Sequence, residues 1–268
     1  MTEGGRGWKG GKGGKGRMGW VGGKGWMVAM ACLLASPAAI HAQQRGGRGT
    51  PAAPREAAAI DLTGYWVSVI TEDWKYRMVT PRKGVFDSLT LNAEGRRVGD
   101  SWDPARDEAA GEQCRSYGAA NIMRLPGRVH VTWQDANTLR LDTDTGTQTR
   151  LFFFGAAPTA GGPTWQGQSV AQWEYAGGGR GGVRTGNLKV VTTNLLPGYV
   201  RKNGAPYSGK TVVTEYYDLN TIPNGDQWMT VTTKVEDPLY FNRPYLTTSD
   251  FKKLPNASGW APTPCSAK

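Results

Sequence analysis

The stretch RVHVTWQDANTLRLDTDTGTQTRLFFF, residues 128–154, decides the fold. Apolar and polar side chains alternate along three short runs of this stretch. Two turns separate the runs, Asp135-Ala136-Asn137 and Asp144-Thr145-Gly146. Alternation with a period of two is typical of strands that have one packed and one polar face, and turns of this composition are typical of hairpins. The stretch therefore predicts an antiparallel meander of three strands.

The two three-residue turns also predict which residues lie opposite one another. Trp133 is expected opposite Leu139, and both Val131 and Thr149 are expected opposite Leu141. A slip of one residue would exchange the two faces, so this register is a specific prediction. The packed face would continue through Leu151 and Phe153, and the polar face would carry His130, Arg140, Asp142, Gln148 and Arg150.

The remainder of residues 60–268 has the same character, with short runs rich in Val, Thr, Tyr, Trp and Phe between Gly, Pro, Asn and Asp. Such runs predict strands. One helix is expected from Asn92 to Trp102, with Asn92 as N-cap and Asp103-Pro104 as its end. The predicted fold is all-β, an antiparallel β-barrel or strongly curved sheet with one short helix. Strands are expected near 64–71, 74–79, 128–134, 138–143, 147–154, 168–175, 187–194, 210–218 and 228–236.

The N-terminal region resembles an export signal. Residues 1–25 are basic and glycine-rich, and residues 25–42 contain no charged side chain and end in small residues. This order predicts a signal peptide over 1–42 and a periplasmic or secreted protein. The apolar run is short for a bilayer of roughly 30 Å, so no stable membrane span is expected after cleavage, although a retained anchor and a start at Met18 are alternatives. Residues 43–59 predict a flexible linker before a barrel-like domain over 60–268.

Charge and cysteine content narrow the class of protein. The formal net charge is +10, but residues 1–42 contribute +5 of it, so no nucleic-acid binding is expected. Cys32 lies in the leader, which leaves Cys114 and Cys265. Two cysteines in an exported chain predict one disulfide between them, and two free thiols are the alternative.

Few residues of the mature chain have catalytic potential. His130 is its one histidine, which excludes a zinc site built from several histidines, and no metal site is predicted. His130 with Asp142 gives two members of a hydrolytic triad, although a cross-strand pair on a solvated face explains them as well. Glu174 and Glu215, each beside aromatic residues, are candidates for paired carboxylates if they point inward. The glycine run 177–182 lacks the ending of a phosphate-binding loop, and no cofactor is predicted.

Tryptophan is abundant, and eight of the 11 lie after the leader. Aromatic side chains can fill a β core or line a cavity that holds a small ligand. The leading expectation is a non-catalytic protein that binds a small apolar or carbohydrate-like ligand in the barrel, with Trp66, Trp74 and Trp133 lining the cavity. The alternatives are a secreted hydrolase that uses His130–Asp142 or an inward glutamate pair, and an envelope component that contacts another protein.

Segments of the chain resemble those of two groups of known proteins. The segments Cys114-Arg-Ser-Tyr-Gly118, 123–133, 142–150 and 236–240 resemble those of a group of exported bacterial proteins with no established activity. This resemblance implies export and a β-rich fold, and it supplies no catalytic residues. Gly64-Tyr-Trp66 is similar to the Gly-x-Trp of lipocalin-type barrels, which implies that a basic residue near the chain end, Lys252 or Lys253, covers the tryptophan.

Overall fold

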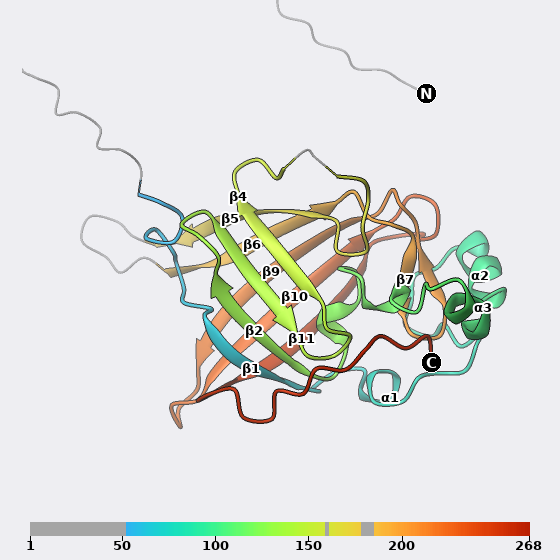
Figure 1. Ribbon diagram of the computed structural model, residues 1–268, viewed down its shortest axis with the longest axis horizontal. Helices are drawn as coiled ribbons and strands as arrows, with labels where there is room; N and C mark the ends of the chain where they lie inside the picture. Colours follow the sequence, from blue (N-terminus) through green and yellow to red (C-terminus); the bar gives the residue numbers. More distant parts are fainter. Residues whose placement is uncertain (1–51, 159–160, 178–184) are drawn as a thin grey trace, which may run out of the picture. The chain divides into compact units, whose positions relative to one another are not determined.

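Nine strands form a closed barrel (Figure 1). The structure is a computed structural model that describes residues 52–158, 161–177 and 185–268. Around the barrel the strands follow the order β1-β11-β10-β9-β6-β5-β4-β3-β2, and β2 pairs with β1 to close it. The predicted β-barrel is therefore confirmed. The strands of the barrel are β1 (Gly64–Val69), β2 (Arg128–Trp133), β3 (Thr138–Thr143), β4 (Thr149–Phe154), β5 (Gln168–Ala176), β6 (Thr185–Thr193), β9 (Val212–Thr221), β10 (Gln227–Glu236) and β11 (Tyr245–Leu254).

The register between β2 and β3 is the predicted one. Trp133 lies opposite Leu139, and Val131 lies opposite Leu141. The three-residue turn is closed by the Gln134 amide, which donates to the Thr138 carbonyl at 3.0 Å. The Asp135 carboxylate accepts from the Asn137 amide at 2.7 Å within the turn. This hairpin is specified by its own residues.

The predicted register between β3 and β4 is wrong by one residue. Arg150, not Thr149, lies opposite Leu141. The loop contains four residues because Thr147, with φ of 50°, also belongs to it. The Thr143 amide donates to the Gln148 carbonyl at 2.9 Å and closes the longer loop. The slip exchanges the faces of β4, so Arg150 and Phe152 point into the barrel and Leu151 and Phe153 do not.

One pair of barrel strands is parallel, which corrects the expectation of a wholly antiparallel barrel. Strand β5 pairs with β4 in parallel, with Phe152 opposite Ser169. The connection over 155–167 is long enough to bring the chain back alongside β4, as a parallel pair requires. The other barrel neighbours are antiparallel.

Helical segments precede the second strand, and there are more of them than the one helix predicted. They are α1 (Trp74–Arg77), α2 (Ala93–Asp100), α3 (Pro104–Ala109) and the 3₁₀ turns η1 (Arg115–Tyr117) and η2 (Ile122–Arg124). The strand predicted over 74–79 is wrong because α1 occupies that position. The predicted N-cap of α2 is confirmed, since the Asn92 side chain accepts from the Gly95 amide at 2.8 Å. Asp103-Pro104 does not simply end α2; Asp103 caps α3, and Pro104 begins it.

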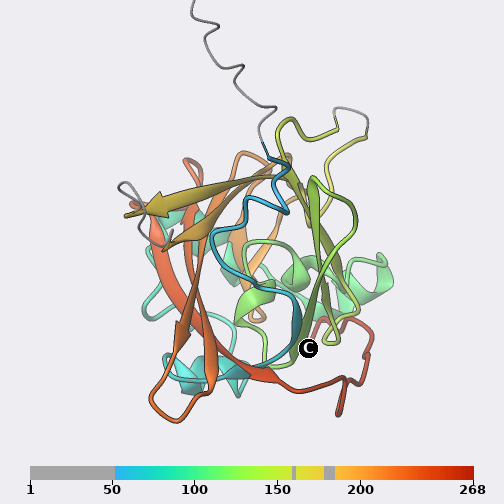
Figure 2. The same ribbon diagram turned by 90° about the vertical axis from the view of Figure 1, so that its left-hand side faces the viewer.

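Large side chains fill the barrel. The most deeply buried ones include Trp66, Phe152, Leu188, Tyr217 and Met229. Ile122 and Met123 of η2 and Leu62 before β1 belong to the same core cluster. Figure 2 faces the barrel end that residues 52–62 cross. None of the cavities described below lies among these buried side chains.

A second apolar cluster lies beside the barrel core. It contains a separate two-stranded sheet, β7 (Gly198–Arg201) with β8 (Ala205–Tyr207), against which α2 packs. Gly204 in the turn of this sheet has φ of 81°, and an added Cβ would lie 2.1 Å from the ring of Trp102. A glycine is therefore required there by both backbone conformation and space. Other members include Phe86, Leu91, Val200, Val235, Phe241 and Tyr245.

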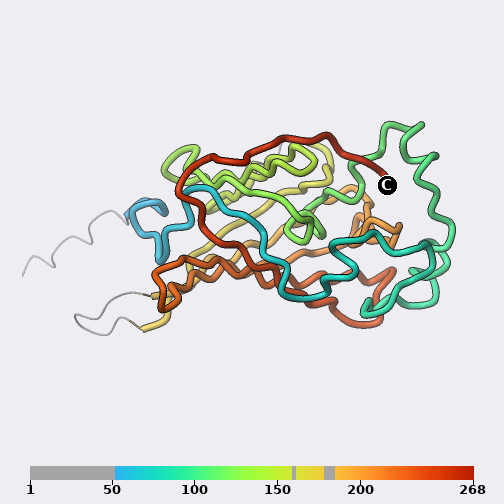
Figure 3. Tube along the Cα trace, turned by 90° about the horizontal axis from the view of Figure 1, so that it is seen from below, coloured from blue at the N-terminus to red at the C-terminus, as the bar shows by residue number. Residues whose placement is uncertain are grey.

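The chain end returns to the middle of the sequence. Residues 255–268 run along the outside of the barrel (Figure 3), where the Thr263 amide donates to the Asp144 carbonyl at 2.8 Å. The predicted disulfide between Cys114 and Cys265 is present. It joins residues separated by 151 positions and so closes most of the domain into one covalent loop.

Residues 52–59, predicted as the end of a flexible linker, contact the barrel. The Arg55 amide donates to the Ala136 carbonyl at 3.1 Å, and Trp173 Nε1 donates to the Pro54 carbonyl at 2.8 Å. The predicted leader, the first part of the linker and most of the glycine run at 177–182 lie outside the described residues. Over the part of the chain that is described, no helix has the length and apolar character needed to cross a membrane.

Candidate functional site

His130 and Asp142 lie opposite one another on β2 and β3, as predicted. They do not form a catalytic dyad. Asp142 accepts two bonds from Arg140, at 2.7 and 2.9 Å, and the ring of His130 stacks on Tyr65 at 3.9 Å instead of bonding to Asp142. Burial lowers the pKa of His130, while Asp142 opposes that shift. A hydrolytic triad would also need a serine beside His130. Ser169 does not meet that need, because its hydroxyl is buried inside the barrel, on the other face of the sheet, and bonds to Thr192. The arrangement is that of a solvated surface pair.

The two candidate glutamates lie on opposite faces of the barrel wall. Glu174 is partly exposed and pairs with Lys189 at 3.4 Å. Glu215 points inward and is fully buried. The inward pair of glutamates is therefore wrong as a geometric prediction, because only one of them faces the interior.

Glu215 is paired with Arg150, the residue that the register slip turns inward. The two guanidinium Nη atoms donate to the two carboxylate oxygens at 2.8 and 2.6 Å, and both side chains are 0% exposed. Burial lowers the pKa of Arg150, but the charges and hydrogen bonds of Glu215 and Tyr217 together raise it, so the net pKa is raised. Such a fork-to-fork pair is neutral overall. It neutralises two charges inside the core.

The three tryptophans proposed as cavity lining lie in three different environments. Trp66 is buried in the core, where its Nε1 donates to the Leu62 carbonyl at 2.9 Å and Lys253 Nζ lies 5.3 Å from the ring centre. Trp74 is 67% exposed on α1 and lines no barrel cavity. Trp133 stacks with Phe154 at 5.5 Å, beside a hollow of about 390 Å³ next to residues 55–63. The structure brings none of the three together.

A more enclosed cavity lies outside the barrel, between α2, α3 and the β7–β8 sheet. Its volume is about 140 Å³. Aromatic rings form much of its wall, and four charged residues reach it. It is lined by Val98, Ser101, Trp102, Asp103, Arg106, Asp107, Arg115, Pro197, Gly198, Tyr199, Pro206, Tyr207 and Tyr240. We call it the helix-side cavity.

Two tyrosines give the helix-side cavity its polar character. Tyr199 Oη donates to Asp107 at 2.8 Å, and Arg115, which also donates to Asp107 at 3.1 Å, lies over the Tyr199 ring at 4.8 Å. Tyr207 is completely buried, and its Oη has no hydrogen-bond partner in the part of the chain that the structure describes. Burial raises the pKa of both phenols, so both stay protonated donors at neutral pH.

Sequence reasoning missed this cavity because its walls come from segments that are far apart. The available signal was a pair of glycines. An added Cβ at Gly118 would lie 2.3 Å from Tyr207 Oη, and one at Gly198 would lie 2.6 Å from it. Both positions must therefore be glycine for the Tyr207 side chain to occupy its observed position. Gly118 belongs to the segment Cys114-Arg-Ser-Tyr-Gly118, and only the fold shows which ring it accommodates.

Two features of the structure bear on function, the helix-side cavity and the packed barrel interior. Comparison of the chain with protein-family models, with curated proteins and with solved structures gives no match.

Proposed function

We propose that this chain is an exported, non-catalytic protein that binds a small apolar or carbohydrate-like ligand in the helix-side cavity. The observation that carries the proposal is an aromatic-walled cavity lined by buried polar side chains, among them Tyr207, whose hydroxyl has no hydrogen-bond partner among the described residues. A buried hydroxyl without a partner costs roughly 1–3 kcal/mol, and a ligand that accepts its hydrogen bond recovers that energy. The site differs from the barrel interior that the tryptophan content suggested.

The size of the cavity restricts the ligand. Its volume of about 140 Å³ is close to the roughly 150 Å³ of an engineered cavity that holds benzene. One six-membered ring is therefore the expected occupant. Aromatic walls suit the apolar faces of such a ring, and Asp107, Arg115 and the Tyr207 hydroxyl suit hydroxyl groups at its edge. A single sugar ring or a hydroxylated aromatic ring combines these features.

Export and a location in the periplasm or outside the cell are part of the proposal. Residues 1–42 have the order of a signal peptide. The Cys114–Cys265 disulfide is compatible with an oxidising compartment. The hydrolase alternative has less support, because Asp142 accepts from Arg140, no hydrogen bond joins His130 or Asp142 to a serine among the described residues, and Glu215 is neutralised by Arg150.

Trp102 provides a direct test, since it lines the cavity. The full chain would be labelled with 5-fluorotryptophan, and the Trp102 resonance would be assigned with Trp102→Phe. Single-ring sugars and phenols would then be titrated. We expect a saturable shift at Trp102, and an affinity about tenfold weaker in Tyr207→Phe, as for loss of one buried hydrogen bond. A shift at Trp133 alone would place binding at the barrel end and refute this site, as would no saturable shift with any compound.

A second candidate function is supported by a separate observation. Trp74, Met78 and Val79 are 67%, 59% and 67% exposed at and just after α1. Adjacent exposed apolar side chains are typical of a surface that contacts another protein, which fits an envelope component. A photo-crosslinking residue at position 74, compared with one at Arg97 on α2, tests it in intact cells. A discrete crosslinked product at position 74 alone would support this function.

A further inference from the structure

The segment 74–86, between the first strand of the barrel and α2, has an outward side that is both apolar and basic. It contains four cations and no acidic residue. One cation, Arg77, is buried, and the other three are exposed, as are three apolar side chains at and just after α1. We call these exposed apolar and basic residues, Trp74, Lys75, Met78, Val79, Arg82 and Lys83, the α1 strip.

The turn of α1 arranges the first part of the strip. The Met78 amide donates to the Trp74 carbonyl at 2.8 Å, so these two side chains lie one helical turn apart on the same side. Lys75 and Val79 are their exposed neighbours in sequence. The intervening Arg77 is buried, so α1 has an inward and an outward side.

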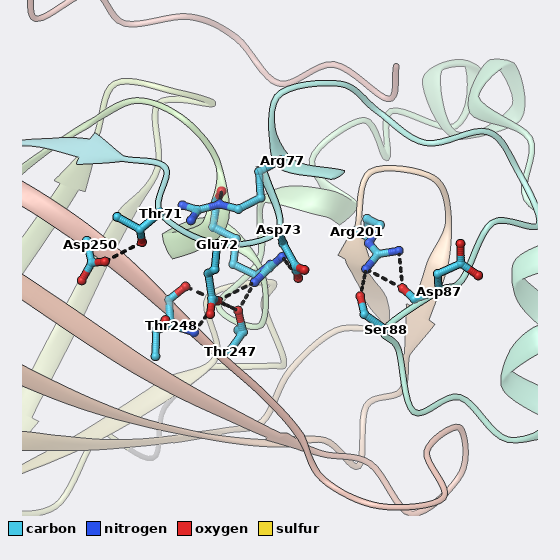
Figure 4. Close-up of polar contacts among 11 residues, drawn as sticks. Thr71, Glu72, Asp73, Arg77, Asp87, Ser88, Arg201, Thr247, Thr248 and Asp250 are labelled. Carbon is cyan, nitrogen blue, oxygen red and sulfur yellow. Dashed lines mark hydrogen bonds and ion pairs between the residues drawn. The ribbon is translucent and has the colours of Figure 1, made fainter. Parts of the chain in front are cut away.

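The inward side of this region is attached to the barrel (Figure 4). The Thr71 hydroxyl donates to Asp250 of β11 at 2.5 Å, and the Thr248 amide donates to Glu72 at 2.6 Å. The side chain of Arg77 points toward Thr71 and Asp250. The beginning of the segment is therefore held against β11.

The end of the segment is held by the β7–β8 sheet and its turn. The guanidinium of Arg201 donates to the Ser88 hydroxyl at 3.0 Å (Figure 4). Asn203 Nδ2 donates to the carbonyls of Arg82 and Val85 at 3.1 and 2.8 Å. Because both ends are fixed, the strip is presented without the cost of ordering a loop when it binds.

The acidic residues on either side of the segment do not neutralise the strip. Asp73 pairs with Arg124 at 3.0 Å, and the Asp87 carboxylate accepts from Tyr76 Oη at 3.1 Å. Within residues 52–158, 161–177 and 185–268, none of the three exposed cations of the strip forms an ion pair. The strip therefore combines unpaired positive charge with exposed apolar side chains.

We propose that the α1 strip binds the surface of a membrane that contains anionic lipid. Tryptophan is enriched at the headgroup level of bilayers, apolar side chains enter the boundary below it, and cations are attracted to anionic lipid. A stable protein interface takes roughly 20–30 residues from each side, far more than the strip contains. The charge and the small size of the strip therefore favour a membrane over the protein partner of the second candidate function.

The site is independent of ligand binding, because no residue of the strip lines the helix-side cavity. Labelling from within the bilayer tests it on the full chain. The probes are vesicles of phosphatidylcholine, alone or mixed with an equal amount of phosphatidylglycerol, that contain a lipid with a photoreactive diazirine in its acyl chain. After irradiation, mass spectrometry of the digested chain locates the label. We expect label over 74–79 with the anionic vesicles and much less with phosphatidylcholine alone.

Matched variants separate the two contributions to binding. Trp74→Ser should strongly lower the label at 78–79, and Leu246→Ser is its control, because Leu246 is an apolar side chain that is 62% exposed on β11. Lys83→Gln should lower the label about fivefold at limiting lipid, as for loss of one cation near an anionic surface. Arg97→Gln, on α2, changes the net charge equally and should have little effect. All four positions are exposed, so circular dichroism should be unchanged.

Several outcomes would overturn the site. Label confined to residues 1–42 would assign attachment to the predicted leader, and an absence of label over 74–79 would exclude the strip. Equal label with both kinds of vesicle would refute recognition of anionic lipid. Equal losses in a variant and its control would assign binding to the general surface. A discrete protein product from a photo-crosslinking residue at position 74, without lipid label there, would replace the membrane by a protein partner.

Discussion

The barrel interior and the helix-side cavity both bury polar side chains among aromatic rings, but they treat these polar groups differently. Inside the barrel, Arg150 donates two short hydrogen bonds to Glu215, although its Nε has no partner among the described residues, and large side chains surround the pair. In the helix-side cavity, Asp107 accepts from Tyr199 and Arg115, whereas the Tyr207 hydroxyl has no partner within residues 52–158, 161–177 and 185–268.

This difference separates a structural polar group from one that is available for binding. An ion pair whose two carboxylate oxygens are already occupied inside the core offers no free acceptor to a ligand. An unpartnered donor at a cavity wall is a cost that the fold tolerates and a ligand can remove. Burial alone does not distinguish a structural polar group from one that is available for binding. The hydrogen-bond partners of the group and the free volume beside it distinguish the two.

The largest expected effect comes from breaking the barrel pair. Glu215→Gln leaves Arg150 buried without its counter-ion and should lower the free energy of unfolding by about 3–5 kcal/mol in urea titrations. Glu174→Gln is the matched control on the outer face and should cost less than about 1 kcal/mol. The double variant Arg150→Met with Glu215→Leu should lose less than Glu215→Gln alone. Equal losses for Glu215→Gln and Glu174→Gln would show that the buried ion pair contributes no more to the free energy of unfolding than the exposed one.

Removal of the disulfide is expected to rank second. Cys114→Ser with Cys265→Ser opens a loop of 151 positions and should lower the free energy of unfolding by about 2–4 kcal/mol. Cys114 precedes η1, whose Arg115 lines the helix-side cavity. Hydrogen exchange should therefore rise around η1 more than in β9 and β10. Reductant should destabilise the wild-type chain and leave the variant unchanged; a response of the variant would contradict the assignment.

The two tyrosines of the helix-side cavity differ in whether their hydroxyl has a hydrogen-bond partner, so their removal should have different effects on stability. Tyr199→Phe removes a hydrogen bond to the buried Asp107 and should cost about 1–2 kcal/mol. Tyr207→Phe removes a hydroxyl that has no partner, so the stability should change by less than about 0.5 kcal/mol, or increase. Chemical denaturation of both variants without ligand measures the difference. A larger loss in Tyr207→Phe would mean that its hydroxyl is already satisfied.

The smallest expected effect concerns the outer face of the barrel. Burial lowers the pKa of His130 below its usual 6.5, so the unfolded chain binds this proton more readily than the folded chain. The resulting stability is present above pH 6.5 and is lost as the pH falls through the lower folded pKa. His130→Gln should flatten the pH dependence of the urea midpoint in that window. The pKa of Asp142 is also lowered, but from 3.8, so its contribution appears at lower pH.

The β2–β3 hairpin shows what local sequence can determine. Alternation over 128–143 and the turn Asp135-Ala136-Asn137 predict the observed register, because the turn is closed by its own side chain and backbone. The disulfide and the N-cap Asn92 were predictable for similar reasons: cysteine number and a capping residue are local information.

Strand β11 and helix α1 show where such reasoning fails. The inward positions of β11 include Thr247 and Ser249, small polar residues that interrupt the apolar alternation by which strands are recognised. Helix α1 begins after Asp73, which has φ of 48° and bonds to Arg124, a residue 51 positions away. Neither feature appears in a short window of sequence.

The sequence by itself determined the β-rich class, the first hairpin and the cysteine pair, since periodicity, turn residues and counts are properties of neighbouring residues. The tertiary structure decided the β3–β4 register. There the Asp144 side chain accepts from the Arg128 amide at 2.7 Å, Thr145 donates to the Pro126 carbonyl at 2.8 Å, and the Thr263 amide donates to the Asp144 carbonyl. These bonds from distant segments hold the loop at four residues. That one added residue turns Arg150 inward to Glu215, because strand side chains alternate with a period of two.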